Sequence, residues 1–306
     1  MPDSLSIKHS QSRVSNSAEP RLSVLIPYFK DDPCDLIASL IPQVTENHDV
    51  EICLYDDGSG DLSLDRRVSV VVETAPGIVR LMCASENRGR SFARNTLKAN
   101  ARADWVLFLD ADMRPVTDHF ITDYLEAIDS GTADIIFGGF KVPKDVSDPR
   151  QELHRAFSET SDCLTLEDRQ ARGPQYVCSS NLCVRKSVLD AEPFDPEFSG
   201  WGWEDSEWAA RTAARFRLLH ADIPALHLGL ESTETLLSRF KNSGANYLRF
   251  TRKHPDLAKT LKLYNVTNTL KKIPGQKLMR PVLKLLVKPA FMPTRLRLAA
   301  LKLWRA

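Results

Sequence analysis

Short apolar runs separated by helix-forming stretches dominate the first third of the chain. The runs occupy residues 22–27, 50–55, 78–84 and 105–109. Each run is long enough for a strand that is buried on both faces, and too short for a buried helix. Helix-forming sequence follows Asp31 and Asp32 and recurs over residues 88–103. This alternation predicts an α/β fold, in which a mostly parallel, Rossmann-like central sheet is flanked by helices.

The remaining sequence divides by composition. Residues 1–20 are polar, so we expect a disordered leader. Beyond residue 115 the pattern predicts helices at 117–130, 207–214 and 232–254, strands at 133–142, 176–185 and 216–220, and a helix plus loop within 144–175. We therefore expect one folded domain over residues 21–255, with halves at 21–114 and 115–235. A basic amphipathic helical tail is expected over residues 256–306.

Acidic residues follow two of the apolar runs. Asp56 and Asp57 come after the second run, and Asp110 and Asp112 after the fourth. Ligands of open α/β sheets bind outside the carboxyl ends of the strands, so these side chains mark a candidate site. Two carboxylates two residues apart can both turn toward one hard cation such as Mg²⁺ or Mn²⁺. The alternative for both pairs is a plain solvated turn, since Asp and Gly favour turns.

Two further segments carry candidate chemistry. Residues 87–95 place a glycine turn and basic residues at the start of a helix, an arrangement that suits the binding of an anion. Alternatively, these basic residues only solvate the surface of the helix. Residues 200–208 contain two Gly-Trp pairs followed by Glu204 and Asp205. Exposed indoles stack on sugar rings, and a neighbouring carboxylate can act as a general base. Alternatively, Trp203 and Trp208 belong to the core and the acids cap a helix. His227 by itself indicates only a structural histidine.

Taken in order, these segments resemble glycosyltransferase family 2 with the GT-A fold. The resemblance covers residues 22–255: residues 87–95 fit the N-x-G-x-x-x-A-R-N pattern, residues 110–112 the D-x-D motif, and residues 56–59 the nucleotide-binding turn. The GWGWED segment looks like the acceptor motif of β-1,4-galactosyltransferases and bacterial chondroitin-type polymerases. The resemblance implies an inverting enzyme with a UDP-sugar donor and Mn²⁺ or Mg²⁺ as cofactor. Residues 21–114 would bind the donor and residues 115–235 the acceptor.

The resemblance also assigns roles to individual residues of this chain. The nucleotide-sugar would contact Pro27, Tyr28, Asp56, Asp57, Asn87, Arg94, Asp110 and Ala111. The metal would be held by Asp110, Asp112 and His227, which reverses the structural interpretation of His227. The acceptor would contact Trp201, Gly202, Trp203 and Glu204. Asp205, with Glu204 beside it, would be the catalytic base.

The implied reaction is a single displacement on a saccharide acceptor in the synthesis of a cell-surface polysaccharide or glycoconjugate. Asp205 would deprotonate an acceptor hydroxyl, which attacks the anomeric carbon as the diphosphate leaves. Processive membrane synthases carry membrane-spanning helices and a QxxRW motif, and chondroitin-type polymerases carry a second transferase domain. The sequence has none of these features, which favours single addition over polymerisation.

Charge is distributed unevenly along the chain. All 40 acidic residues lie within residues 1–256, whereas twelve of the 41 basic residues follow in the tail. Helical periodicity over residues 278–288 groups Arg280, Lys284 and Lys288 opposite Leu278, Val282, Leu283 and Leu286, and residues 295–305 repeat the pattern. This pattern predicts binding to an anionic membrane, where a lipid-linked acceptor would lie. The alternative is a helix that packs on the acidic body. No motif supports nucleic-acid binding.

Cysteine usage and hydropathy bear on the compartment. The six cysteines form no CxxC pair, and several lie in apolar runs, as expected of buried thiols in a reducing compartment. We find neither an apolar signal segment nor a membrane span, so we expect a cytoplasmic protein at the membrane periphery. Two other functions stay open. A sugar nucleotidyltransferase would carry a glycine-rich loop after the first strand, where residues 27–30 have no glycine. A non-catalytic saccharide-binding protein could use the same fold.

Overall fold

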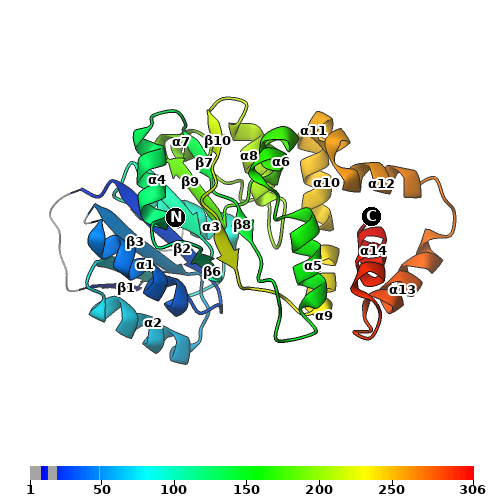
Figure 1. The fold of residues 1–306 in the computed structure, drawn as a ribbon, viewed down its shortest axis with the longest axis horizontal. Helices are drawn as coiled ribbons and strands as arrows, with labels where there is room; N and C mark the ends of the chain where they lie inside the picture. The colour runs from blue at the N-terminus through cyan, green and yellow to red at the C-terminus, as the bar shows by residue number, and fades with distance from the viewer. Residues whose placement is uncertain (1–7, 13–18, 48) are drawn as a thin grey trace, which may run out of the picture.

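The computed structural model describes residues 8–12, 19–47 and 49–306. Its centre is an eight-stranded sheet with helices on both faces, which confirms the predicted α/β fold (Figure 1). In spatial order the strands are β1 (Lys8–Gln11), β4 (Ile78–Cys83), β3 (Val50–Asp56), β2 (Leu22–Tyr28), β5 (Trp105–Leu109), β9 (Asn181–Arg185), β7 (Ile135–Phe137) and β10 (Leu218–His220).

The four central strands β2 to β5 are parallel, as their buried apolar runs predict. Strand β9 runs antiparallel to both β5 and β7, and β10 is parallel to β7. Strand β1 pairs antiparallel with β4, with Lys8 opposite Cys83. The expected disordered leader is therefore wrong for residues 8–11, because main-chain pairing to a sheet edge does not require an apolar sequence. Residues 1–7 and 13–18 of the predicted leader lie outside the described residues.

Alternating side chains of the central strands build one apolar core on each face of the sheet. In β2, Val24 and Ile26 contribute to the first core and Leu25 to the second. The first core is covered by α1 (Cys34–Glu46), α2 (Leu62–Thr74) and α4 (Phe120–Asp129). The second is covered by α3 (Arg90–Asn100), α7 (Lys186–Ala191) and α8 (Glu204–Thr212). Burial of both strand faces explains why these runs are continuously apolar.

A small second sheet extends from the carboxyl edge of the first. Strand β11 (Ala225–His227) lies between β6 (Met113–Pro115), to which it is antiparallel, and β8 (Phe140–Lys141), to which it is parallel. The predicted strand at 133–142 is thus split between two sheets, because Gly138 and Gly139 turn the chain and Gly139 has a φ of +77°. The predicted strand at 176–185 begins only at Asn181, after a 3₁₀ helix at Pro174–Tyr176.

Helices form the rest of the molecule (Figure 1). They are α5 (Glu152–Ser161), α6 (Leu166–Arg172), α9 (Thr233–Asn242), α10 (Gly244–Lys253), α11 (Pro255–Thr260), α12 (Lys262–Leu270), α13 (Gln276–Val287) and α14 (Thr294–Arg305). Helices α13 and α14 form a hairpin that packs on α5 and α9 through Phe157, Phe240, Val287 and Leu301. Across residues 8–12, 19–47 and 49–306, no helix is long and apolar enough to cross a membrane.

Part of the basic tail therefore packs on the body. The guanidinium of Arg297 is buried, and it donates hydrogen bonds to the Val287 carbonyl at 2.9 Å and to Thr233 Oγ1 at 2.8 Å. By contrast, the outer face of α13 exposes Leu278, Val282 and Leu285. The interpretation that the tail packs on the body thus holds for its inner face, whereas membrane binding by the exposed outer face stays a prediction.

Candidate active site

The expected residues meet at the carboxyl edge of the central sheet. Tyr28 and Asp56 end β2 and β3 and are register partners, while Asp110 follows β5 directly. The Tyr28 ring nevertheless points into the first core, and its buried hydroxyl has no hydrogen-bond partner among the described residues. This burial raises the pKa of Tyr28. Tyr28 therefore lies behind the edge, and Pro27 beside it is half-buried.

Asp56 fixes the turn that follows β3. Its Oδ1 atom accepts hydrogen bonds from the Ser59 amide at 2.9 Å and from Ser59 Oγ at 2.5 Å. Ser59 Oγ in turn accepts the Lys30 amide at 2.7 Å, which joins this turn to the loop after β2. At Gly58, with a φ of +74°, an added Cβ would lie 2.3 Å from the Glu86 carbonyl carbon. The turn needs glycine because the segment before α3 packs directly against it.

Asp57 orders the start of α3. Its carboxylate accepts hydrogen bonds from Asn87 Nδ2 at 2.9 Å, from the Arg88 amide at 3.0 Å and from the Gly89 amide at 2.7 Å. Burial raises the pKa of Asp57, and the hydrogen bonds from Arg88 and Gly89 oppose that shift. The structure thus brings together Asp57 and Asn87, both of which were predicted to contact the nucleotide-sugar. Their side chains are, however, hydrogen-bonded to each other. Both residues shape the glycine turn ahead of the helix.

Arg94 is the centre of the charged cluster. It is 1% exposed, and its Nη2 lies 3.3 Å from Asp110 Oδ1 while its Nη1 lies 3.4 Å from Asp205 Oδ1 and 3.7 Å from Glu204 Oε1. Burial acts to lower the pKa of Arg94, but the charges of Asp205, Asp110 and Glu204 raise it overall. The guanidinium therefore stays charged and connects the D-x-D end of β5 to the start of α8.

The two acids that begin α8 differ in environment. Glu204 is buried, and burial together with the charge of Asp205 raises the pKa of Glu204. Its Oε2 atom has no partner in the part of the chain that the structure describes. Asp205 is partly open, and it accepts the Ser179 amide at 3.0 Å and Ser179 Oγ at 2.7 Å. Sequence reasoning missed Ser179, because nothing in its local pattern indicates contact with a residue 26 positions away.

Asp112 and His227 form the second half of the site. His227 Nε2 lies 3.3 Å from Asp112 Oδ2. Burial acts to raise the pKa of Asp112, but the interaction with His227 holds this pKa below its usual value. For His227, burial acts to lower the pKa, but the interaction with Asp112 raises it overall. A Cβ at Gly229 would lie 1.8 Å from Asp112 Oδ2, so only glycine allows this approach. The buried atoms Asp112 Oδ1 and His227 Nδ1 have no partner among the residues described.

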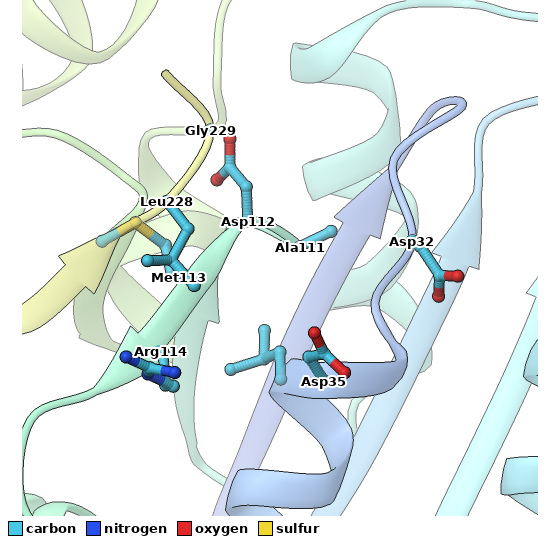
Figure 2. Close-up of a pocket in the computed structure, with 9 residues that line it drawn as sticks. Asp32, Asp35, Ala111, Asp112, Met113, Arg114, Leu228 and Gly229 are labelled. Atoms are coloured by element: carbon cyan, nitrogen blue, oxygen red, sulfur yellow. The ribbon is translucent and has the colours of Figure 1, made fainter. Parts of the chain in front are cut away.

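A cavity of about 200 Å³ opens beside Asp112 (Figure 2). It is lined by the loop after β2 (Asp32), the start of α1 (Asp35), residues 111–114 and the Leu228–Gly229 turn. Figure 2 shows the Asp112 carboxylate directed toward Gly229, while Ala111 lies on the side of β2. Ala111 and Asp112 therefore face an open space, as a donor site at this edge requires.

The residues present suit a hard divalent cation in part. Asp112 offers an unpartnered oxygen beside a histidine nitrogen, and Mn²⁺ or Mg²⁺ accepts such ligands together with substrate phosphates and water. Asp110, however, turns toward Arg94. Over residues 8–12, 19–47 and 49–306, no three metal-ligating side chains form one group. Asp112 and His227 thus come together as expected, and ligation by Asp110 stays a prediction.

The GWGWED loop is held by aromatic packing. Trp201 lies 5.5 Å from the Phe240 ring, and Trp203 lies 5.0 Å from Tyr247 and 5.1 Å from Phe250. Asn246 Nδ2 donates to the Gly202 carbonyl at 2.9 Å. Trp203 has a φ of +75°, an unusual conformation for a bulky residue. Both indoles are half-buried, and Trp208 is fully buried, so core packing explains more of this tryptophan cluster than an exposed platform does.

Residues 23–191 match glycosyl transferase family 2, and the chain therefore belongs to this family. A 90-residue stretch is 36% identical to a protein of Mycobacterium tuberculosis (strain CDC 1551 / Oshkosh) described as putative glycosyltransferases. That stretch is 29% of this chain and 25% of the relative, so the chain spans only a quarter of the relative's length.

Solved structures share the fold at low sequence identity. S. aureus TarS 1-349 matches 87% of this chain and 79% of its own, with 17% identity and a TM-score of 0.53. The mannosyltransferase PcManGT from Pyrobaculum calidifontis matches 94% of this chain and 86% of its own, with 16% identity and a TM-score of 0.51. GalNAc-T7 matches 78% of this chain and 48% of its own, with 15% identity and a TM-score of 0.56. These neighbours confirm the GT-A fold that the motifs predict.

Proposed function

We propose that this chain is an inverting glycosyltransferase that moves a sugar from a UDP-sugar to a saccharide acceptor. The observation that carries the proposal is the buried Arg94, which contacts Asp110 at the strand end and Asp205 at the start of α8. The Arg94 guanidinium thereby holds the D-x-D segment at a fixed separation from the candidate base Asp205. A solvated turn at residues 110–112 would have no need of this arrangement.

Asp205 is the proposed general base. Ser179 donates two hydrogen bonds to its carboxylate, and Arg94 lies on the same oxygen as Ser179 Oγ. These contacts hold the carboxylate in one orientation, and a carboxylate held in this way can serve as general base for an acceptor hydroxyl. An acceptor hydroxyl deprotonated by Asp205 would attack the anomeric carbon from the face opposite the leaving diphosphate, and this attack inverts the configuration. Glu204 Oε2, unpartnered among the described residues, offers a second acceptor contact.

The donor and the cofactor are inferred from the site and its neighbours. Asp112 and His227 would hold Mn²⁺ or Mg²⁺ beside Asp110, and the metal would neutralise the charge of the diphosphate. TarS 1-349 has been solved in complex with UDP-GlcNAc, PcManGT with GDP-Man and Mn²⁺, and GalNAc-T7 with UDP, GalNAc and Mn²⁺. We favour UDP because the motifs resemble UDP-dependent relatives. Synthesis of a cell-surface polysaccharide or glycoconjugate is the proposed setting.

The outer face of α13 supports a peripheral position at a membrane. Leu278 is 79% exposed and Leu285 is 68% exposed, and the same helix carries the exposed basic residues Arg280, Lys284 and Lys288 on another part of its surface. A helix with this composition binds an anionic surface through both apolar burial and charge. The six cysteines are free, as expected in a reducing compartment, so we place the protein at the cytoplasmic face. A lipid-linked acceptor would then lie within reach.

Substitution of the candidate base tests the proposal. Asp205→Asn should lower transfer by about 100-fold or more, because a general base commonly supplies that factor. UDP affinity in the presence of Mn²⁺ should stay within about twofold of the wild-type value. Asp190→Asn, an exposed acid paired with Lys98, is the matched control and should keep full activity. Full transfer by Asp205→Asn would remove Asp205 from the mechanism.

A screen of nucleotide sugars separates the other candidate functions. Metal-dependent hydrolysis of one UDP-sugar, measured as released UDP, supports a transferase and names the donor. Release of pyrophosphate from UTP and a sugar 1-phosphate would instead identify a nucleotidyltransferase. Saccharide binding without any turnover would leave the non-catalytic binding protein as the remaining function.

A further inference from the structure

The C-terminal helix contributes a charged side chain to the same aromatic group that holds the GWGWED loop. The guanidinium carbon of Arg305 lies 4.3 Å from the ring centre of Phe240, 5.6 Å from that of Phe157 and 6.0 Å from that of Trp203. Phe240 also packs against Trp201. Arg305 therefore contacts Trp203 of the candidate acceptor loop directly and shares the Phe240 ring with Trp201, although 102 positions separate it from Trp203.

The hydrogen-bonding capacity of Arg305 is unused. Within the described part of the chain, its guanidinium makes no hydrogen bond and no ion pair, whereas the buried guanidiniums of Arg94, Arg169 and Arg297 all donate to protein oxygens. Stacking on aromatic faces leaves the in-plane N–H groups of an arginine free. No Arg305 nitrogen is among the buried atoms without a partner in the described residues, so its donors reach solvent and are available to a ligand with an anionic or strongly polar group.

An acid and a second cation lie beside Arg305. Asp162 caps the C-terminus of α5, and Lys302 Nζ donates to Thr160 Oγ1 at 3.3 Å on the last turn of that helix. Asp162 is exposed and directly follows α5, the helix whose Phe157 ring lies against the Arg305 guanidinium. Arg305 and Lys302 of α14 thus lie against the last turns of α5, which Asp162 ends, so two cations stand beside one acid.

We infer that Arg305, with Lys302 and Asp162, forms an acceptor subsite that selects a saccharide carrying an anionic group. The inference rests on the proposed function and names the acceptor class for that site. The guanidinium would pair with a carboxylate or a phosphate, and Asp162 would accept hydrogen bonds from sugar hydroxyls. The anionic group could come from a uronic acid or from the diphosphate of a lipid-linked sugar. A tail that only docked on the body would need apolar contacts alone at this position.

Binding of probe saccharides tests the subsite. The full chain, saturated with UDP and Mn²⁺, is titrated with methyl β-D-glucuronide against methyl β-D-glucopyranoside, and with citronellyl-diphosphate-linked N-acetylglucosamine against methyl N-acetyl-β-D-glucosaminide. We expect one anionic probe to bind about tenfold or more tightly than its neutral counterpart, as charge-assisted pairing predicts. Preference for the glucuronide identifies a uronate, and preference for the diphosphate identifies a lipid-linked acceptor. Equal binding of both pairs overturns the inference.

Variants in α14 test whether Arg305 is responsible for the preference for an anionic probe. Arg305→Met keeps an alkyl chain over the rings and should abolish the preference, whereas Arg305→Lys should keep most of it. Arg295→Met, which removes an exposed arginine of α14, is the matched control and should leave the preference intact. The thermal midpoint of each variant reports whether the hairpin still docks. A folded Arg305→Met protein with unchanged preference contradicts the inference. UDP binding by a protein that shows no preference for the anionic probes leaves the proposed transferase function standing.

Discussion

Arg94 Nη1 lies 3.4 Å from Oδ1 of Asp205, although the two residues lie on different helices, α3 and α8, and are 111 positions apart. This contact places the permanent positive charge of a buried guanidinium at the candidate base, which is itself partly open to solvent. Because the same guanidinium also contacts Asp110, the donor side and the acceptor side of the site share one cation. Several consequences of that arrangement are measurable.

Loss of the Arg94 charge should destabilise the fold. Arg94→Met leaves Asp205 and Asp110 without their cation and leaves Glu204 paired with Arg90 alone. Breaking a buried ion pair typically costs about 3–5 kcal/mol. Urea unfolding should show this loss with an unchanged m-value. Arg66→Met, which removes an exposed arginine of α2, should change stability by less than about 0.5 kcal/mol. Equal stability of the two variants would mean that Arg94 is not the counter-charge of the cluster.

Asp57 should affect the donor site through the turn before α3. Asp57→Ala removes the acceptor of hydrogen bonds from Asn87, Arg88 and Gly89, so the turn should loosen and UDP affinity should fall about tenfold. The N-cap Asp61 of α2 provides a control, because Asp61→Ala also removes two capping hydrogen bonds, at a residue outside the predicted nucleotide-sugar contacts. Calorimetric titration with UDP and Mn²⁺ measures both variants. A loss of affinity as large in Asp61→Ala would point to general destabilisation.

Gly229 should be indispensable for metal-dependent nucleotide binding. An alanine Cβ would lie 1.8 Å from Asp112 Oδ2, so Gly229→Ala must displace either the carboxylate or the turn. We expect Mn²⁺-dependent UDP binding to weaken by about tenfold or more, while UDP binding without metal changes little. Gly244→Ala is the control, since a Cβ there meets no atom within 4 Å. Unchanged metal dependence in Gly229→Ala would show that Asp112 can ligate from another position.

Buried histidines should make the fold sensitive to acid. Burial and the charge of Arg169 lower the pKa of His220 to about 4. The unfolded chain therefore binds a proton at this residue below about pH 6.5 while the folded protein does not, so stability present at neutral pH is lost as the pH falls toward 4. His220→Phe should reduce the slope of the unfolding free energy by up to about 1.4 kcal/mol per pH unit over this window. The exposed His119→Gln variant controls for loss of a histidine, and an unchanged slope in His220→Phe would contradict the assignment.

Membrane binding should depend on the outer face of α13. The wild-type chain should sediment with phosphatidylglycerol vesicles at low salt, and with phosphatidylcholine vesicles about tenfold less. Leu278→Gln, Val282→Gln and Leu285→Gln together should lower that binding without unfolding the protein, because all three side chains are exposed. Leu62→Gln, an exposed position on α2, is the control. A wild-type chain that ignores anionic vesicles would reject the membrane proposal.

The sequence alone was sufficient to predict the strands whose own residues form apolar runs. The continuous apolar runs of β2, β3 and β5 could only be strands buried on both faces, and the acids that follow them necessarily reached one edge. The break between β7 and β8 could not be read from the apolar letters, because it depends on what surrounds Gly138. A Cβ there would lie 2.3 Å from Tyr124 Oη, an atom contributed by α4.

Contacts between distant segments account for what the sequence concealed in the site. Asp57 and Asn87 were predicted as ligand contacts, but their mutual hydrogen bond exists only because the turn after β3 packs on the segment before α3. Tyr28 was expected to contact the nucleotide-sugar, yet the side-chain alternation of β2 turns its ring into the core. Ser179 and Arg305 gave no local signal, since their partners lie on other elements.

The antiparallel pairing of β1 with β4 bears on how the protein behaves when shortened. Strand β1 satisfies the outward amide and carbonyl groups of β4, and Ser12 continues this cover with hydrogen bonds to Val79. A chain trimmed to start at Arg21 would keep every candidate site residue but would present β4 as an open sheet edge. Open edges recruit strands from other molecules. Trimming the polar leader, the usual step toward a better-behaved sample, is therefore expected to promote self-association in this protein.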